Sequence, residues 1–223
     1  MNPQKVEISN AALFDCRVPY LKSLFDSCEY PWEIVLRVSE YAKMLVLNGI
    51  EGFSLYSDGV LVGRGVKIAP SATICPPAVI GEDCEIRVGA YIRGGVILGR
   101  GVVVGNSSEL KNCVMLDGAQ APHYNYVGDS VLGNYSHLGA GAICSNLRSD
   151  GRDVVVRADT AIPTRMRKLG AMLGDHVEVG CGCVLNPGTI VGKSSRIYPL
   201  TSLRGTVPPK CIVKSATNVV EIK

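Results

Sequence analysis

The sequence predicts an all-β fold, a parallel β-helix built from hexapeptides, and three observations lead to it. Small residues follow many of the repeated aliphatic residues, as corner turns require. The chain has 25 Gly, 12 Pro and only 19% charged residues, which suits a β fold with many tight turns. A period of six fits neither a helix nor a plain strand, but it is typical of a β-helix with one strand per hexapeptide. That period is carried by Val62, Ile68, Ile74, Ile80, Ile86, Ile92, Leu98, Val104, Leu110 and Leu116.

We expect an N-terminal helical segment (1–57), a β-helix (58–206) with an inserted arm (146–172), and a C-terminal tail (207–223). Pro31 suits a first helical position, and Ile34, Val38 and Leu45 recur at helical spacing until the helix should end at Asn48-Gly49. An open solenoid end exposes unpaired strand edges and apolar core. We therefore expect the helical segment to pack across an end of the solenoid.

The repeat of the β-helix continues to Pro122, where the aliphatic residue is lost, and then changes its spacing. It shortens to five residues twice, at Val127 and Leu132, and resumes at Leu138 and Cys144. After the arm it returns at Leu173, Val179, Leu185, Val191, Ile197 and Leu203. The number of hexapeptides predicts about seven coils of three strands.

Charge and composition narrow the function classes. A net charge of +3 is too small to indicate nucleic acid or a membrane surface as a partner. The most apolar stretch, 34–50, is interrupted by Arg37, Glu40 and Lys43, and the N-terminus has no signal-peptide pattern. Nine cysteines form an odd number without a CxxC pair, which favours a reduced, cytoplasmic protein over a disulfide framework.

Two cations break the rule that a small residue follows each inward aliphatic residue. Arg93 follows Ile92 and Lys111 follows Leu110, so the cations are 18 residues apart and should stack one coil apart, at about 4.8 Å. Like charges this close cost free energy unless an anion or a carboxylate lies between them. We interpret the pair as a site for an anionic ligand such as a sugar phosphate. The alternative is a solvated edge on which Glu109 is the partner.

The same spacing predicts a second column of Arg87, Gly105 and His123. His123 follows Pro122, where the repeat is distorted, and an imidazole at such a corner beside cations is a candidate general base. The alternative is a structural histidine. His137 lies 14 residues after His123 and His176 lies 39 residues after His137, spacings that do not suit a zinc site of three histidines. We predict no metal site, and a solvent-facing corner at His176.

From Val104 to Asn146 the sequence resembles the acetyltransferase half of bacterial bifunctional N-acetylglucosamine-1-phosphate uridylyltransferases, which are hexapeptide-repeat proteins. The motifs are Val104-Gly105-Asn106, Glu109-Leu110-Lys111, His123-Tyr124-Asn125-Tyr126-Val127-Gly128-Asp129, and Gly139-Ala140-Gly141 with Asn146. The stretches Asn146-Leu147-Arg148 and Arg167-Lys168-Leu169-Gly170-Ala171 are closer to archaeal-type sugar-phosphate nucleotidylyltransferases with a similar C-terminal glucosamine-1-phosphate acetyltransferase domain. The resemblance covers roughly residues 60–207.

The resemblance implies a left-handed β-helix, acetyl-CoA as the co-substrate, and a homotrimer with sites between subunits. It also implies roles for individual residues. His123 matches the catalytic base, Arg93, Lys111 and Tyr126 match residues that contact the sugar phosphate, and Ala140 and Asn146 match residues that line the acetyl-CoA site. Two positions depart from the bacterial pattern: His137 replaces an Asn that contacts substrate, and Cys181 replaces a Ser near the cofactor.

The basic arm 146–172 leaves two interpretations open. It carries Arg148, Arg152, Arg157, Arg165, Arg167 and Lys168 against Asp150, Asp153 and Asp159. This surplus could hold the phosphates of coenzyme A or a neighbouring subunit, or it could belong to a solvated arm. Val154-Val155-Val156 suggests a short strand there.

The predicted function is an acetyl-CoA-dependent N-acetyltransferase that acts on an amino-sugar phosphate, such as glucosamine-1-phosphate, or on a nucleotide-linked amino sugar. Backbone N–H groups at the distorted corner are expected to stabilise the oxyanion. About 60 residues precede the solenoid, too few for a doubly wound nucleotidylyltransferase domain, so we expect no such activity. The alternative is a non-catalytic sugar-nucleotide-binding or regulatory subunit.

Overall fold

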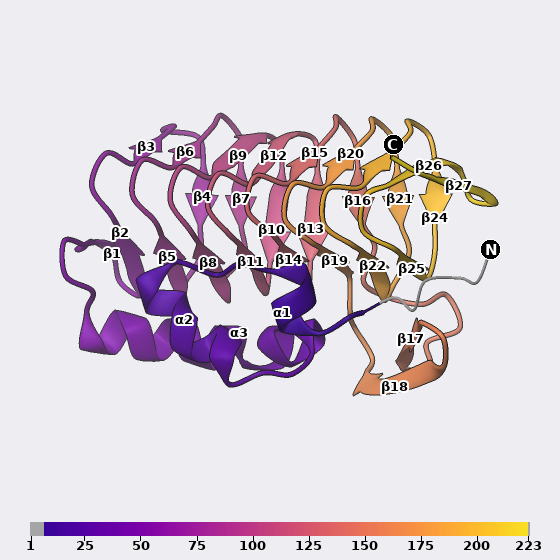
Figure 1. Cartoon of the computed structure of the whole chain (residues 1–223). Helices are drawn as coiled ribbons and strands as arrows, with labels where there is room; N and C mark the ends of the chain where they lie inside the picture. Colours follow the sequence, from indigo (N-terminus) through magenta and orange to yellow (C-terminus); the bar gives the residue numbers. More distant parts are fainter. Residues whose placement is uncertain (1–6, 223) are drawn as a thin grey trace.

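A computed structural model describes residues 7–222, and it confirms the predicted β-helix of hexapeptides (Figure 1). Three sheets, here called faces A, B and C, wrap one long core, and each strand pairs in parallel with the strand of the next coil. Face A consists of β1 (Ser54–Ser57), β2 (Val60–Val62), β5 (Ala78–Ile80), β8 (Val96–Leu98), β11 (Cys113–Met115), β14 (Val131–Leu132), β19 (Ala171–Leu173), β22 (Thr189–Val191) and β25 (Thr206–Val207). Face B consists of β3 (Lys67–Ile68), β6 (Glu85–Ile86), β9 (Val103–Asn106), β12 (Gln120–His123), β15 (His137–Leu138), β20 (Glu178–Val179), β23 (Arg196–Ile197), β26 (Cys211–Ser215) and β27 (Asn218–Glu221). Face C consists of β4 (Thr73–Ile74), β7 (Tyr91–Ile92), β10 (Glu109–Lys111), β13 (Tyr126–Gly128), β16 (Ile143–Cys144), β21 (Val184–Leu185) and β24 (Ser202–Leu203).

The solenoid is slightly longer than the predicted seven coils. Faces A and B each hold nine strands and face C holds seven. The outermost strands β1 and β27 pair antiparallel with their neighbours, unlike the strands between them. Each end of the solenoid therefore finishes in a short hairpin, which leaves fewer unpaired strand edges.

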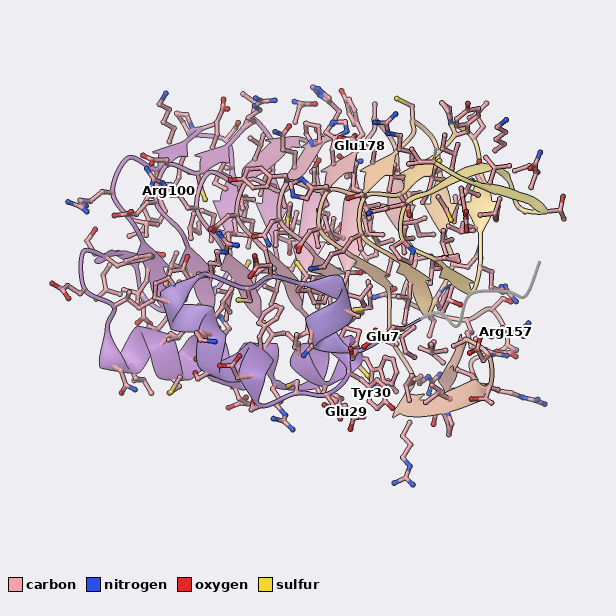
Figure 2. All side chains as sticks on the ribbon, in the orientation of Figure 1. Glu7, Glu29, Tyr30, Arg100, Arg157 and Glu178 are labelled. Atoms are coloured by element: carbon pink, nitrogen blue, oxygen red, sulfur yellow. The ribbon has the colours of Figure 1, made fainter. Side chains whose placement is uncertain are left out.

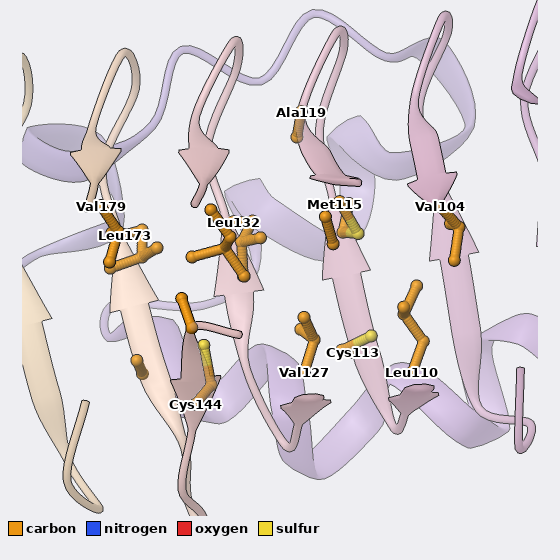
Figure 3. Close-up of a cluster of buried hydrophobic side chains, with 14 of the residues drawn as sticks. Val104, Leu110, Cys113, Met115, Ala119, Val127, Leu132, Cys144, Leu173 and Val179 are labelled. Carbon is orange, nitrogen blue, oxygen red and sulfur yellow. The ribbon is translucent and has the colours of Figure 1, made fainter. Parts of the chain in front are cut away.

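The interior of the solenoid is filled by the repeated aliphatic side chains (Figure 3). Ile80, Ile92 and Leu110 are fully buried there, as the sixfold period predicts. Burying one such side chain contributes about 1.5–3 kcal/mol, so the repeat itself supplies the stability of the coils.

The register prediction is wrong between Leu110 and Val127. Met115 pairs with Leu98, and Met115 rather than Leu116 fills the core, while Ala121 takes the place predicted for Pro122. The first five-residue step therefore ends at Met115, twelve residues before the predicted position, whereas the step at Leu132 is as predicted. Leu116 is also buried, but on the outer side of face A. Met115 and Leu116 are both apolar because side chains are buried on both sides of face A. The sixfold period alone does not show which of the two faces the core.

The N-terminal helices α1 (Asn10–Leu13), α2 (Pro19–Asp26) and α3 (Pro31–Asn48) lie along the outer side of face A, not across an end as predicted (Figure 1). The longest of them, α3, contacts β5, β8, β11 and β14, and ends at Gly49 as expected. Face A offers a second apolar surface because the middle residue of each strand is aliphatic: Val79, Ile97, Val114 and Val131. The helices bury this apolar surface when they pack on face A.

The arm also packs on face A, at the C-terminal part of the solenoid. It forms an antiparallel hairpin of β17 (Val154–Arg157) and β18 (Ala161–Met166). Val154 and Val156 are buried in the same outer core as the helices, so the predicted short strand is present and anchored. Of the expected segments 1–57 and 207–223, residues 1–6 and 223 lie outside the described part. Within residues 7–222, none of the helices has the length and apolar character needed to cross a membrane.

Candidate functional site

His123 lies at the corner between faces B and C, in a column different from the one predicted. It pairs with Asn106 in the preceding coil, so the expected column of Arg87, Gly105 and His123 is wrong. The early five-residue step at Met115 causes this shift by one residue. Gln120 pairs with His137 in the next coil, and His137 pairs with Glu178 in the coil after that. Three residues further along each of these strands come His123, Ala140 and Cys181, which therefore stack in one column. All three are exposed, so one candidate base and two candidate cofactor residues form a continuous open column.

Asn125 holds the corner that carries His123. This side chain is only 3% exposed, and its Oδ1 accepts a hydrogen bond from the backbone N–H of His123 at 3.0 Å. Its Nδ2 donates to the backbone oxygens of Gly139 at 2.8 Å and Ala142 at 3.2 Å, in the next coil. Asn125 is therefore a positioning residue that fixes the corner against the coil above it.

The prediction that backbone N–H groups at this corner stabilise the oxyanion is wrong. The backbone N–H groups of residues 123–126 already donate to Asn125 Oδ1, Asn106 O, Ser108 Oγ and Ala142 O. Such paired donors are not free for a ligand. Among residues 7–222, no acceptor lies within hydrogen-bond distance of the N–H of Ala140, one coil beyond His123. The N–H group available to a ligand is therefore that of Ala140, in the column of His123, and not one at the corner itself.

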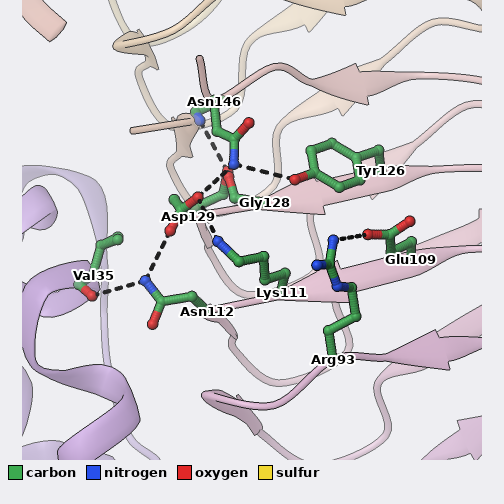
Figure 4. Close-up of polar contacts among 11 residues, drawn as sticks. Val35, Arg93, Glu109, Lys111, Asn112, Tyr126, Gly128, Asp129 and Asn146 are labelled. Atoms are coloured by element: carbon green, nitrogen blue, oxygen red, sulfur yellow. Dashed lines mark hydrogen bonds and ion pairs between the residues drawn. The ribbon is translucent and has the colours of Figure 1, made fainter. Parts of the chain in front are cut away.

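Face C carries a polar network of Lys111, Tyr126, Asp129 and Asn146, shown in Figure 4. The Asn146 amide donates to the Tyr126 hydroxyl at 3.1 Å and to Asp129 Oδ2. Lys111 Nζ lies 3.5 Å from the same carboxylate, whose side chain is 7% exposed. The network therefore joins three of the predicted site residues through one nearly buried carboxylate.

The ring of Tyr126 lies along face C above Gly128. A β-carbon at Gly128 would be 2.5 Å from the Tyr126 hydroxyl oxygen, so only glycine leaves room for this side chain. Partial burial raises the pKa of Tyr126, and the charges of Asp129 and Glu109 act in the same direction. The phenol is thus held neutral as a hydrogen-bonding group that reaches from the His123 corner toward Asn146.

Each of the two stacked cations has a carboxylate partner in the chain. Arg93 forms an ion pair with Glu109 at 2.8 Å, as the alternative interpretation expected, and Lys111 lies near Asp129. An external anion is therefore not needed to keep the two cations one coil apart. Their contact with a ligand stays a prediction.

His137 lies apart from the other predicted site residues. It is at the start of β15 on face B, and its Nδ1 is 3.2 Å from a carboxylate oxygen of Glu178 in the next coil. The network of Lys111, Tyr126 and Asn146 is on face C instead. The prediction for His137 thus concerns a different side of the coil.

Two polar residues of the network were not recognised in the sequence. Asp129 ends one of the motifs that carry the resemblance, but no site role was predicted for it or for Asn112. Asn112 Nδ2 donates to Asp129 Oδ1 at 2.9 Å and to the backbone oxygen of Val35 in α3 at 3.2 Å (Figure 4). Both residues have positive φ angles near 48°, where Asn and Asp are favoured, and this corner pattern was the available signal. Within residues 7–222, His, Cys, Asp and Glu side chains form no group of three suited to a metal ion.

Comparison with known proteins gives a family match and several relatives. The model of the family "Bacterial transferase hexapeptide (six repeats)" matches residues 59–94 and 77–112. A bifunctional protein GlmU of Methanococcus maripaludis is 37% identical over 180 residues, which are 79% of this chain and 44% of that protein. A bifunctional sugar-1-phosphate nucleotidylyltransferase/acetyltransferase of Sulfurisphaera tokodaii is 42% identical over 94 residues, 42% of this chain and 23% of that protein. The chain thus spans less than half the length of these curated relatives.

Comparison with solved structures finds acyltransferases at low sequence identity and low TM-score. One is a variant of AntD, an N-acyltransferase from Bacillus cereus in complex with dTDP and Coenzyme A, with a TM-score of 0.47 and 15% identity over 78% of this chain and 91% of that chain. Another is a variant of perosamine N-acetyltransferase from Caulobacter crescentus in complex with CoA and GDP-perosamine, with a TM-score of 0.33 and 14% identity over 66% of this chain and 51% of that chain. Similarities at this level are too distant to assign a ligand.

Proposed function

Since the chain belongs to the hexapeptide-repeat family, we propose that it is an acyltransferase that uses acetyl-CoA to acetylate the amine of an amino-sugar phosphate or a nucleotide-linked amino sugar. The observation that carries the proposal is the exposed His123 at the head of the column with Ala140 and Cys181, three residues before the Tyr126 network. One side of this corner offers a proton acceptor, and the other offers hydrogen bonds and charge for a polar substrate.

In the proposed reaction the substrate amine attacks the carbonyl carbon of the thioester. The imidazole of His123 accepts the proton that the amine loses, a C–N bond forms, and the C–S bond breaks so that coenzyme A leaves as a thiolate, which takes that proton from the imidazolium to become the thiol. The unpaired N–H of Ala140 is the donor for the oxyanion that develops on the carbonyl oxygen. No acyl-enzyme is needed, and Cys144 is unsuited to be a nucleophile because burial raises its pKa to about 12.

The substrate would lie on face C. Lys111 ends β10 on this face and Arg93 directly follows β7, while the Tyr126 hydroxyl and the Asn146 amide belong to the next two coils. A phosphate on the substrate would compete with Glu109 for Arg93 and with Asp129 for Lys111. Because the Arg93–Glu109 pair is exposed and weak, this exchange costs little. A homotrimer with sites between subunits is part of the proposal, and a solution mass of three chains would support it.

The experiment is the release of free thiol from acetyl-CoA in the presence of glucosamine-1-phosphate, or of UDP-linked amino sugars. Turnover on one of them supports the enzyme. The second candidate is a sugar-nucleotide-binding or regulatory subunit, because the polar network of Lys111, Tyr126 and Asn146 could bind a sugar nucleotide without a reaction at His123. Binding of a UDP-sugar, without release of thiol from acetyl-CoA in the presence of any amino sugar, would identify that subunit and contradict the enzyme.

A further inference from the structure

We propose that a pocket between the arm and the last coils, here called the arm pocket, binds a phosphate or pyrophosphate group of a ligand. The arm pocket has a volume of about 270 Å³. Its lining includes Arg148, Arg157 and Arg204, together with Ser145 and Asn186. None of the residues of the His123 column or of the Tyr126 network lines it, although Ser145 and Leu147 on either side of Asn146 do.

The fold brings the three arginines together from three segments. Arg204 follows Leu203 at the end of β24, the last strand of face C, and Arg148 opens the arm. Arg157 ends β17, in which Val154 and Val156 are buried on face A while Val155 and Arg157 alternate to the opposite side. This alternation turns Val155 and Arg157 to the arm pocket (Figure 2 labels Arg157 on the arm).

The charges in the arm pocket are not balanced. Arg148 forms a two-point ion pair with Asp150, which lowers the pKa of that carboxyl group, and this is the one carboxylate in the lining. Within residues 7–222, no carboxylate lies within 4.0 Å of the guanidinium of Arg157 or Arg204. Two guanidiniums that share a pocket without partners repel each other, and a phosphate accepts two parallel hydrogen bonds from each. The excess of positive charge in the arm pocket thus favours the binding of an anion with several oxygen atoms.

The wall that carries Arg148 and Arg157 is anchored to the solenoid. Leu147 and Lys168 form an isolated bridge that closes the base of the arm, and the Thr164 hydroxyl donates to the backbone oxygen of Val154 at 2.6 Å. At Gly205 a β-carbon would stand 3.6 Å from the Arg157 backbone oxygen, so the arm lies against the last coil. The guanidiniums are therefore presented from fixed backbone, which lowers the entropy lost on binding.

The size of the arm pocket restricts its occupant. Pockets that enclose a whole small ligand measure roughly 300–1,000 Å³, so the arm pocket takes one phosphate-bearing part of a larger molecule. Coenzyme A and a sugar nucleotide both carry pyrophosphate. Assignment to either of them rests on the proposed function, whereas the binding of pyrophosphate itself does not.

Calorimetric titration with inorganic pyrophosphate tests the proposal directly on the full chain. We expect a dissociation constant that rises at least tenfold in Arg157→Gln and in Arg204→Gln. Arg165→Gln, which changes an exposed arginine of the same arm outside the pocket, should leave it unchanged. Equal affinity in all four proteins, or no binding by the wild type at millimolar pyrophosphate, would overturn the site. Circular dichroism of each variant establishes that it is folded.

Competition identifies the source of the phosphate. Displacement of pyrophosphate by coenzyme A assigns the arm pocket to the acyl donor, and displacement by a UDP-sugar assigns it to the acceptor. If neither displaces pyrophosphate, its assignment to coenzyme A or to a sugar nucleotide is wrong, and the arm pocket is not part of the proposed acyl-transfer site. These measurements need no turnover, so an inactive protein that still binds pyrophosphate would contradict the proposed reaction while leaving the arm pocket intact.

Discussion

The hydroxyl of Tyr126 and the amide nitrogen of Asn146 lie 3.1 Å apart, although the residues are 20 positions apart in the chain. Tyr126 begins a strand of face C, and Asn146 follows the next strand of the same face at its far edge. The tyrosine side chain therefore crosses the face, from the corner of His123 to the carboxylate of Asp129. It thereby reaches from the corner that carries the candidate base to the polar network.

Gly128→Ala should displace Tyr126 from this position. The three atoms nearest the added β-carbon all belong to the Tyr126 ring and hydroxyl, so this side chain must move. Loss of a hydrogen bond of about 1 kcal/mol predicts a several-fold rise in KM for the amino sugar. Tyr126→Phe removes the hydroxyl alone and should give a similar rise. A normal KM in both variants would show that the phenol does not contact substrate.

Asp129→Asn should destabilise the protein by about 2–3 kcal/mol. The substitution removes the charge that holds Lys111 and weakens the acceptor for the amides of Asn112 and Asn146 in a nearly buried place. Urea denaturation measures the free energy of unfolding. The control is Asp83→Asn, also at positive φ, which breaks the exposed pair with Arg100 and should cost less than about 1 kcal/mol. Equal losses in the two variants would contradict the network.

Cys181 should be the cysteine that alkylating reagents modify first in the folded protein. It is the one exposed cysteine of the nine, while burial raises the pKa of Cys16 and Cys84 to about 12 and keeps those thiols protonated at pH 8. Mass spectrometry after brief iodoacetamide treatment identifies the site. Because Cys181 shares the column of His123 and Ala140, saturating acetyl-CoA should slow its modification. Unchanged modification in acetyl-CoA would mean that the thioester does not run along this column.

The buried thiols predict a loss of stability at alkaline pH. Burial raises the pKa of Cys84 and Cys144 from 9.0 to about 12 in the folded protein. Below pH 9 the thiols are neutral in both states and this contribution is complete. As the pH rises from 9 toward 12, only the unfolded chain ionises, so the free energy of unfolding falls. Denaturation between pH 8 and 11 should show a shallower fall in a Cys84→Ala, Cys144→Ala variant. Parallel curves would contradict the shifts.

The solenoid could be predicted because its sixfold period consists of apolar side chains that can be buried only in the central core. Ile86 and Leu110 each face one core between charged neighbours, so their position follows from apolarity. Met115-Leu116 is different, since both are apolar and both are buried, on opposite sides of face A. The one-residue error there extends to Pro122, so His123 was assigned to Gly105 instead of Asn106, and the predicted register is correct again from Val127.

The polar partners could not be predicted for a different reason. The pairing of Lys111 with Asp129, and of Asn112 with both Asp129 and Val35, depends on side-chain directions at corners, which a sixfold period does not specify. The placement of α3 on face A followed from the aliphatic middle residues Val79 and Ile97. That signal was present in the sequence, but it lies between the repeated positions.

The most direct measurement compares the initial rate of thiol release from acetyl-CoA, with glucosamine-1-phosphate as acceptor, in His123→Asn and His176→Asn. Both histidines are exposed, and His176 stacks on Tyr135 at another corner of the solenoid. The proposed proton transfer predicts that His123→Asn loses about 10²–10⁴-fold in rate while His176→Asn retains the wild-type rate. A wild-type rate in His123→Asn, or an equal loss in both variants, would contradict the assignment of His123 as the base.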